Sequence, residues 1–510
     1  MMTRQHSSGS TSSCALVPAL CVGPFLMALA ACSPPSGPVA AQQAPADPRS
    51  DGAENVRLVG YNDLQGRQSL QVTTKSDAAN GNWVYVGHSP NDRNDPQANE
   101  DAESNDQPIL NPITGKMEYN GTSILEISDP AKPKLVWHIP NEVAHVNSRS
   151  VQVVYDFGPE KRDYLARSWD TGKDFKFQIF DITTRATDPS KISLVSEITG
   201  TPPNNCGPGC GGKFIIRAHK GYWSQQSGLF YTASGEPGFR SVVLHIWDLK
   251  DPKNPKFLGR AILPSQKNGA PGFDREYAHH PVVDEPNHRL YIGFRGAGPL
   301  GAWDITNPAT PKLVWSYDVS PPYRGPHTVS PIVYDTVPNF SGDALPRRYA
   351  FVTDEAGGGA DMKPCKSGVR SMAYMFDITN EAHPIPVSFW QVPVGNFCEK
   401  GGRFGPHQHA ETVNGDLNRF VDKIAWIAYF NAGVRVLDIS DPYNMKELGY
   451  YIPKTNQNSH PLAKGQPTAI QINDVDIDHR GLAYASDRVG TGLFVLEYTG
   501  KKKASPTNTN

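Results

Sequence analysis

Residues 434–442 read VRVLDISDP, a short apolar run that ends in an acidic turn. The same pattern recurs along the chain, as ILEISDP from Ile124, FQIFDIT from Phe177, LHIWDLKDP from Leu244, LGAWDITNP from Leu300 and AYMFDIT from Ala373, with a weaker copy, LFVLEYTG, from Leu493. Aligned on their acidic residues, successive copies lie 55 to 73 residues apart. A repeat of this length indicates structural units that stack in a row or close into a ring.

The copy around residues 423–452 shows what one unit contains. Residues 423–430 (KIAWIAYF) are an apolar run of strand length, residues 431–433 (NAG) a turn, and residues 434–439 alternate as a half-buried strand does. Pro442 has no amide hydrogen, so the strand must end before it. Residues 446–452 predict the next strand, and the innermost strand is expected upstream of the apolar run. Seven such units predict an all-β fold, a seven-bladed β-propeller of four-stranded antiparallel blades over residues 56–499.

The repeat resembles the LVIVD-repeat family, a bacterial β-propeller repeat of the form apolar-x-apolar-Asp-Ile/Val-Ser-Asp-Pro-x-x-Pro. Val434–Pro442 and Leu300–Leu313 match this form most closely, and the resemblance covers most of Val56–Thr499. The chain is also loosely similar to the selenium-binding protein and methanethiol oxidase family, whose propellers are linked to a metal. The motif implies the fold and says little about function, because propellers host many activities.

The first 32 residues have the features of an export signal. Residues 15–31 are apolar but short for a membrane span, and Leu29-Ala30-Ala31-Cys32 resembles a lipobox. The resemblance implies that Cys32 is acylated, with an uncleaved anchor as the alternative, and Ser33 favours the outer membrane. We therefore expect a cell-envelope protein that touches the membrane only through its N-terminal lipid. Residues 1–32 are its signal peptide, 33–55 a flexible tether and 500–510 a disordered tail.

Four cysteines lie beyond the signal and the lipobox: Cys206, Cys210, Cys365 and Cys398. In an oxidising compartment they predict two disulfides, for which three pairings exist. The short, turn-rich spacing favours Cys206–Cys210 with Cys365–Cys398, and a thiolate metal site is the alternative.

Histidines or acids recur just before or within the predicted innermost strands: His145, His219, His279, His280, His327, His407, His409 and Asp474. Innermost strands line the channel of a propeller, so residues at equivalent positions converge there. Imidazoles with a carboxylate suit a divalent transition metal such as copper, iron, zinc or manganese. Glu411 or Asn473 are candidates to complete or orient this set. The alternative is that these side chains only join adjacent blades by hydrogen bonds.

Arginines form a second recurrent set, between the second and third strands of their units: Arg167, Arg240, Arg295, Arg370 and Arg488. Guanidinium groups at the mouth of a channel can hold a carboxylate, sulfate or phosphate. The alternative is that each arginine pairs with an acid of a neighbouring blade.

Together these features favour a metal-dependent enzyme, an oxidoreductase or a hydrolase or lyase, that acts on a small anionic substrate. His280 and His407 are the expected catalytic residues, with Arg295 and Arg370 holding the anion. A net charge of −2 argues against a nucleic-acid partner. The competing hypothesis is a non-catalytic surface lipoprotein that binds a partner protein or polymer through loops such as residues 88–120.

Overall fold

The computed structural model describes residues 47–77, 81–90, 107–171, 174–199, 218–240, 242–271, 276–296, 298–319, 325–355, 371–411, 420–462 and 466–501. The predicted signal peptide with Cys32, three of the cysteines (Cys206, Cys210 and Cys365), and Arg370 lie outside these ranges. Lipidation, the disulfide pairing and the role of Arg370 therefore stay predictions.

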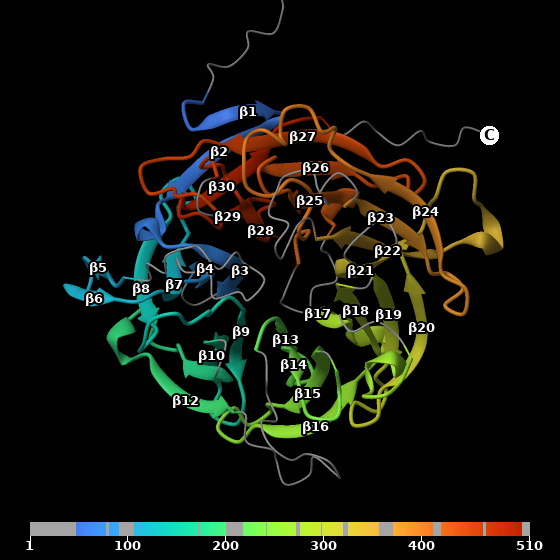
Figure 1. Ribbon diagram of the computed structural model, residues 1–510, viewed down its shortest axis with the longest axis horizontal. Coiled ribbons are helices and arrows are strands. Elements are labelled where there is room, and N and C mark those ends of the chain that lie inside the picture. Colours follow the sequence, from blue (N-terminus) through green and yellow to red (C-terminus); the bar gives the residue numbers. More distant parts are fainter. Residues whose placement is uncertain are drawn as a thin grey trace, which may run out of the picture. The chain divides into compact units, whose positions relative to one another are not determined.

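Seven four-stranded antiparallel sheets surround a central axis as the blades of a propeller, which confirms the predicted fold class (Figure 1). Blade 1 holds β3 (Ser69–Asp77), β4 (Gly81–His88), β7 (Gly121–Glu126) and β8 (Lys134–Pro140). Blade 2 holds β9 (Val151–Phe157), β10 (Arg162–Asp170), β11 (Phe175–Asp181) and β12 (Ser193–Ile198). Blade 3 holds β13 (Gly221–Trp223), β14 (Leu229–Gly235), β15 (Val242–Asp248) and β16 (Lys256–Ala261). Blade 4 holds β17 (Tyr277–Asp284), β18 (Arg289–Arg295), β19 (Pro299–Asp304) and β20 (Lys312–Asp318).

The last three blades bring the two ends of the described chain together. Blade 5 holds β21 (Pro326–Tyr334), β22 (Arg347–Asp354), β23 (Ala373–Asp377) and β24 (Ile385–Trp390). Blade 6 holds β25 (Ile424–Ala428), β26 (Val434–Asp438), β27 (Lys446–Pro453) and, at its outer edge, β1 (Ser50–Glu54). Blade 7 holds β28 (Ile472–Ile477), β29 (Ala483–Asp487), β30 (Leu493–Tyr498) and, at its outer edge, β2 (Val56–Asn62). Because β1 belongs to blade 6, the end of the predicted 33–55 tether is part of the propeller.

Other elements are short. A hairpin of β5 (Ile109–Asn111) and β6 (Lys116–Glu118) projects from blade 1. The helical turns in the described ranges are 3-10 segments at Leu64–Gly66, Pro189–Lys191, Pro264–Gln266, Glu285–Asn287, Gly342–Ala344 and Val421–Lys423. No helix in these ranges is long and apolar enough to cross a bilayer.

The acidic residue of the repeat ends a strand of its blade: β26 in blade 6, β19 in blade 4 and β23 in blade 5. The Oδ1 atom of Asp438 accepts a hydrogen bond of 2.9 Å from the amide of Ser440. Asp304 and Asp377 accept the equivalent bonds from the amides two residues further on, at 2.8 and 2.9 Å. An Asx turn of this kind reverses the chain locally, which explains why the acidic residue recurs once per unit.

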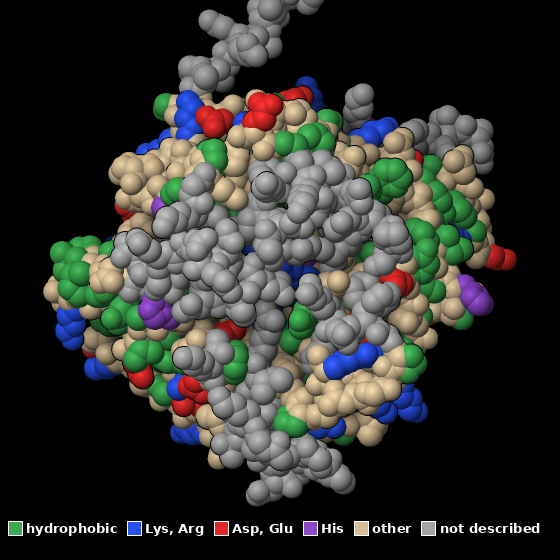
Figure 2. Space-filling view, viewed as in Figure 1, with side chains coloured by type: hydrophobic (Ala, Val, Ile, Leu, Met, Phe, Trp, Pro, Cys, Tyr) green, Lys and Arg blue, Asp and Glu red, His purple; other side chains and the backbone are tan. Residues whose placement is uncertain are grey.

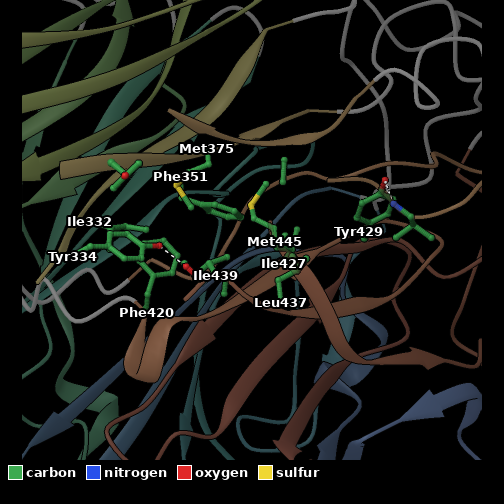
Figure 3. Packing of buried hydrophobic residues seen from close by; sticks show 14 of the residues in the cluster. Ile332, Tyr334, Phe351, Met375, Phe420, Ile427, Tyr429, Leu437, Ile439 and Met445 are labelled. Carbon is green, nitrogen blue, oxygen red and sulfur yellow. Dashed lines mark hydrogen bonds between the residues drawn. The ribbon is translucent and has the colours of Figure 1, made fainter. Parts of the chain in front are cut away.

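Apolar side chains fill the spaces between blades. The cluster in Figure 3 joins blade 5, through Tyr334, Phe351 and Met375, to blade 6, through Ile427 and Leu437. The Tyr334 hydroxyl also donates a 2.6 Å hydrogen bond to the carbonyl of Ile439. Each blade therefore buries its faces against its neighbours, and the ring holds the inner strands in fixed positions around the channel.

Candidate metal centre

Four inner strands, β3, β17, β21 and β28, carry a register shift near the residue at which they begin. The residues within these shifts are Leu70, His279 with His280, His327 and Asn473. A bulge re-aims the side chains of the inserted residues. In a regular strand His279 and His280 would point to opposite faces, but at this bulge both have a ring nitrogen close to His327.

Four histidines from four successive blades lie in one row. The ring of His279 has its centroid 4.5 Å from that of His219 and 4.1 Å from that of His327. The ring of His407 follows, 4.2 Å from His327. The Nε2 atoms of His219 and His279 are 2.8 Å apart, within hydrogen-bond distance. All four side chains are at least nine-tenths buried.

Two overlapping groups of side chains have the spacing of a metal site: His279, His280 and His327, and His327, Glu355 and His407. Within each group the potential ligand atoms lie within 4.8 Å of one another. Two nitrogen ligands of one metal ion lie about 3 to 4 Å apart, so a slight inward movement suffices. His327 is common to both groups.

Hydrogen-bond partners orient three of these imidazoles. His407 Nδ1 bonds to the carbonyl oxygen of Asn473, and His280 Nε2 pairs with the carboxylate of Glu411. His327 Nδ1 lies 2.7 Å from the hydroxyl of Thr328, while its Nε2 has no hydrogen-bond partner among the described residues. Metal-binding histidines are commonly held in this way, through the nitrogen that does not bind the metal. The donor set therefore fits a borderline transition metal.

Burial favours the neutral form of three of the imidazoles, those of His279, His327 and His407. It lowers the pKa values of His279 and His327 well below the ordinary value, and nearby positive charges act in the same direction. Burial also lowers the pKa of His407 to about 3. Neutral imidazole is the form that binds a metal ion, so the lowered pKa values of these three histidines favour metal binding.

Glu355 supplies the carboxylate of the cluster. Its Oε2 forms an ion pair with Arg295 Nε at 2.8 Å, and its Oε1 accepts a hydrogen bond from Arg403 Nη1 at 2.9 Å. The Nε2 atoms of His279 and His407 are 3.9 and 4.0 Å from this carboxylate. Although burial opposes ionisation, Arg295, His407 and Arg403 together lower the pKa of Glu355 to about 2. Arg295 thus pairs with an acid of the neighbouring blade, the alternative given for the arginine set.

A cavity of about 20 Å³ adjoins the cluster. Its described lining includes His219, His279, His407 and Glu355, together with Leu70 and Asn473. Five cationic side chains complete this lining: Arg149, Lys220, Arg295, Arg403 and Arg488. Figure 2 shows Lys and Arg side chains at the centre of this face of the ring. The wall is therefore strongly cationic, with Glu355 as its one described carboxylate.

Two residues of the predicted metal set lie in the blade interfaces. His409 bonds through Nε2 to the Ser330 hydroxyl at 2.7 Å and through Nδ1 to that of Thr353 at 3.3 Å. Asp474 accepts hydrogen bonds from the Val72 amide, at 2.8 Å, and from the side-chain amide of Gln408. Both residues join adjacent blades, as the alternative interpretation had it.

Other predicted residues are also placed away from the cluster. His145 lies half-buried in the loop before β9 and is neither in the two groups nor in the described cavity lining. Arg167 donates to the carbonyls of Ile139 and Pro140, and Arg240 to that of Ser265. These contacts hold loops and blades together.

Three cationic residues of the cavity, Lys220, Arg149 and Arg403, were not predicted. Each lies within four residues of a predicted histidine, at 219, 145 and 407 respectively. The signal was therefore in the same short segments, but the sequence alone does not show which residue of a loop points into a channel.

The comparisons with known proteins agree with the repeat. The LVIVD repeat family model matches residues 422–452, which confirms the first resemblance. No curated protein sequence matches the chain at a significant level.

Solved structures with similar folds include the periplasmic gluconolactonase of Pseudomonas aeruginosa, at 11% identity and a TM-score of 0.42, covering 79% of this chain and 97% of that one. They also include a hypothetical selenium-binding protein from Sulfolobus tokodaii, at 12% identity and a TM-score of 0.48, covering 76% and 89%. A functionally unknown protein from Desulfotomaculum acetoxidans matches at 13% identity and 0.38, covering 74% and 84%. At these identities and TM-scores the similarities indicate no function.

Proposed function

We propose that the channel binds a divalent transition metal and that the protein is a metal-dependent enzyme acting on a small molecule. The observation that carries this proposal is His327, which belongs to both ligand groups. Its Nδ1 lies within hydrogen-bond distance of the Thr328 hydroxyl, and its Nε2 has no hydrogen-bond partner among the described residues. A buried polar nitrogen left in this state is unfavourable unless a ligand completes it.

The surrounding residues have distinct roles in this proposal. His279, His280, His327 and His407 are the candidate nitrogen ligands, and Glu355 supplies negative charge beside them. Glu411 and the carbonyl of Asn473 fix the orientation of His280 and His407. A bound ion would supply Lewis-acid or redox chemistry according to its identity, which separates the hydrolase or lyase class from the oxidoreductase class.

Elemental analysis tests the proposal. The propeller is purified without chelator or affinity nickel, and copper, iron, zinc and manganese are measured in the wild type, His327→Gln and His409→Gln. Wild type and His409→Gln should carry about one ion per chain, because His409 bonds to Ser330 and Thr353 and is not in the two ligand groups. His327→Gln should lose the ion while keeping the same circular dichroism spectrum. Equal metal content in all three proteins, or none in the wild type after reconstitution, would refute the site.

A second candidate function, binding of a partner protein or polymer, is favoured by the β5–β6 hairpin. Three of its apolar side chains are exposed: Leu110 by 56%, Met117 by 61% and Ile113 by 42%. Figure 2 shows this apolar patch at the left edge of the molecule. A double substitution Leu110→Glu with Met117→Glu should abolish capture of such a partner and leave metal content unchanged.

We further propose that the protein is anchored in the cell envelope, in the outer membrane, through acylated Cys32. The proposal is supported by the lipobox resemblance of residues 29–32. Metabolic labelling with palmitate should mark the wild type and not Cys32→Ala; equal labelling of both would contradict it.

A further inference from the structure

Lys220 is a buried ammonium group in the cavity wall. The residue is 3% exposed, and its Nζ donates a 3.1 Å hydrogen bond to the neutral side-chain amide of Gln408. It forms no ion pair with any residue in the described part of the chain, yet it lines the cavity. A buried cation is costly unless a counter-ion accompanies it.

The nearby acids have other partners. Glu411 pairs with His280. Asp474 accepts hydrogen bonds from the side-chain amide of Gln408 and from the Val72 amide, and burial raises its pKa well above the ordinary value. Glu355 is shared between Arg295 and Arg403. The charge of Lys220 is therefore left for a group that enters the cavity.

We infer that this cavity binds the carboxylate group of a small molecule, with Lys220 as its principal counter-charge. Arg149 and Arg488, on the same wall, add to the positive field. A site of about 20 Å³ has little more than the room that one water needs, about 10–15 Å³. A carboxylate is the smallest of the common oxyanion groups, so a small space favours it over tetrahedral sulfate and phosphate.

The proposed anion site adjoins the proposed metal ligands. His279, His407 and Glu355 belong both to the cavity wall and to the proposed metal groups. A carboxylate held at Lys220 would place the rest of the molecule beside those ligands. The description of this molecule as a substrate rests on the proposed function, but the binding of the anion does not.

Anion binding is tested on metal-free protein by calorimetric titration with acetate, with sulfate and phosphate as comparison anions. The test variant is Lys220→Met, which keeps the bulk of the side chain and removes the charge. The matched control is Lys75→Met. Lys75 is 8% exposed and donates a 3.0 Å bond to the side-chain oxygen of Gln225, but it is not among the described residues of the cavity wall.

The wild type and Lys75→Met should bind acetate with equal affinity, more tightly than sulfate or phosphate. Lys220→Met should bind it roughly 10- to 100-fold more weakly, the effect of one charged hydrogen bond, and Lys220→Arg should restore most of the affinity. Equal affinity in Lys220→Met and the wild type, or no acetate binding to the wild type, would overturn the inference. Tighter binding of sulfate or phosphate would overturn the carboxylate assignment.

Metal content, measured on the same preparations, keeps the two proposals separate. Lys220→Met should retain the wild-type metal content, because Lys220 is not in the ligand groups. Acetate binding that depends on Lys220 in a protein that takes up no metal would refute the proposed function and leave the anion site standing.

Discussion

Replacement of Glu355 by glutamine removes the carboxylate that Arg295 and Arg403 share, while the shape of the side chain is kept. Both ion pairs are short, at 2.8 and 2.9 Å, and the Glu355 side chain is 4% exposed. The two guanidinium groups would then face each other across a neutral amide. We therefore expect Glu355→Gln to destabilise the metal-free protein.

The size of the effect follows from the pKa of Glu355, which is lowered from 4.5 to about 2. A shift of that size corresponds to about 3 kcal/mol of stability at neutral pH. Loss of one partner from a buried ion pair costs a similar amount, about 3–5 kcal/mol. Because the folded-state pKa is the lower one, this contribution is fully present above pH 4.5 and is lost as the pH falls towards 2.

Urea denaturation of the metal-free proteins at several pH values measures the effect. Glu160→Gln is the control, because Glu160 pairs with Lys253 at the surface, where both side chains are about half exposed and such a pair contributes about 0–1 kcal/mol. The difference between the wild type and Glu355→Gln should be about 3 kcal/mol at pH 7 and should shrink below pH 4.5. A difference no larger than that of Glu160→Gln, or one independent of pH, would refute the reasoning.

Three further changes test the packing and the buried charges. Phe351 is fully buried between blades 5 and 6, so Phe351→Ala should lower the free energy of unfolding by roughly 3–5 kcal/mol. The control is Phe389→Ala, at a side chain that is 66% exposed, which should change this free energy by less than about 0.5 kcal/mol. Equal losses of the two variants in urea denaturation would contradict the prediction. A Cβ atom on Gly293 would lie 2.3 Å from the carbonyl oxygen of Pro326 in the next blade. Gly293→Ala should therefore lower the free energy of unfolding by about 1–3 kcal/mol and lower the melting temperature. An unchanged melting temperature would contradict this close approach of the two strands. Burial lowers the pKa of His88 from 6.5 to about 3, so the unfolded chain takes up the proton first and stability falls below pH 6.5, by about 2 kcal/mol at pH 5. His88→Asn should show a smaller loss between pH 7 and pH 5, and an equal loss in both proteins would count against this assignment.

The sequence predicts the blades well because each is specified locally. The acidic residue at Asp438 or Asp304 makes its turn with an amide two residues away, so the cause and the motif lie in the same short segment. For residues 50–54 the sequence predicts a tether instead of a strand, because the pairing partner β27 lies about 400 residues away and nothing in the local composition indicates a strand.

The site is less predictable because it depends on how neighbouring blades meet. His407 and His409 lie two residues apart in a segment that makes only isolated bridges to β25 and its neighbours. One faces the channel, and the other bonds to Ser330 and Thr353 of blade 5. Glu355 follows β22 and joins the cluster through Arg295 of β18. A bulge or a contact between blades decides each of these positions, and neither is visible in a local motif.

The location of a bound metal ion tests the central claim most directly. Crystals of the propeller, grown without chelator, would be measured at the absorption edge of the metal found by elemental analysis. We predict an anomalous peak about 2.0–2.1 Å from the Nε2 atom of His327 and from at least two of the candidate ligand atoms of His279, His280, His407 and Glu355. A fully occupied metal elsewhere on the chain, with no peak beside His327, would contradict the account.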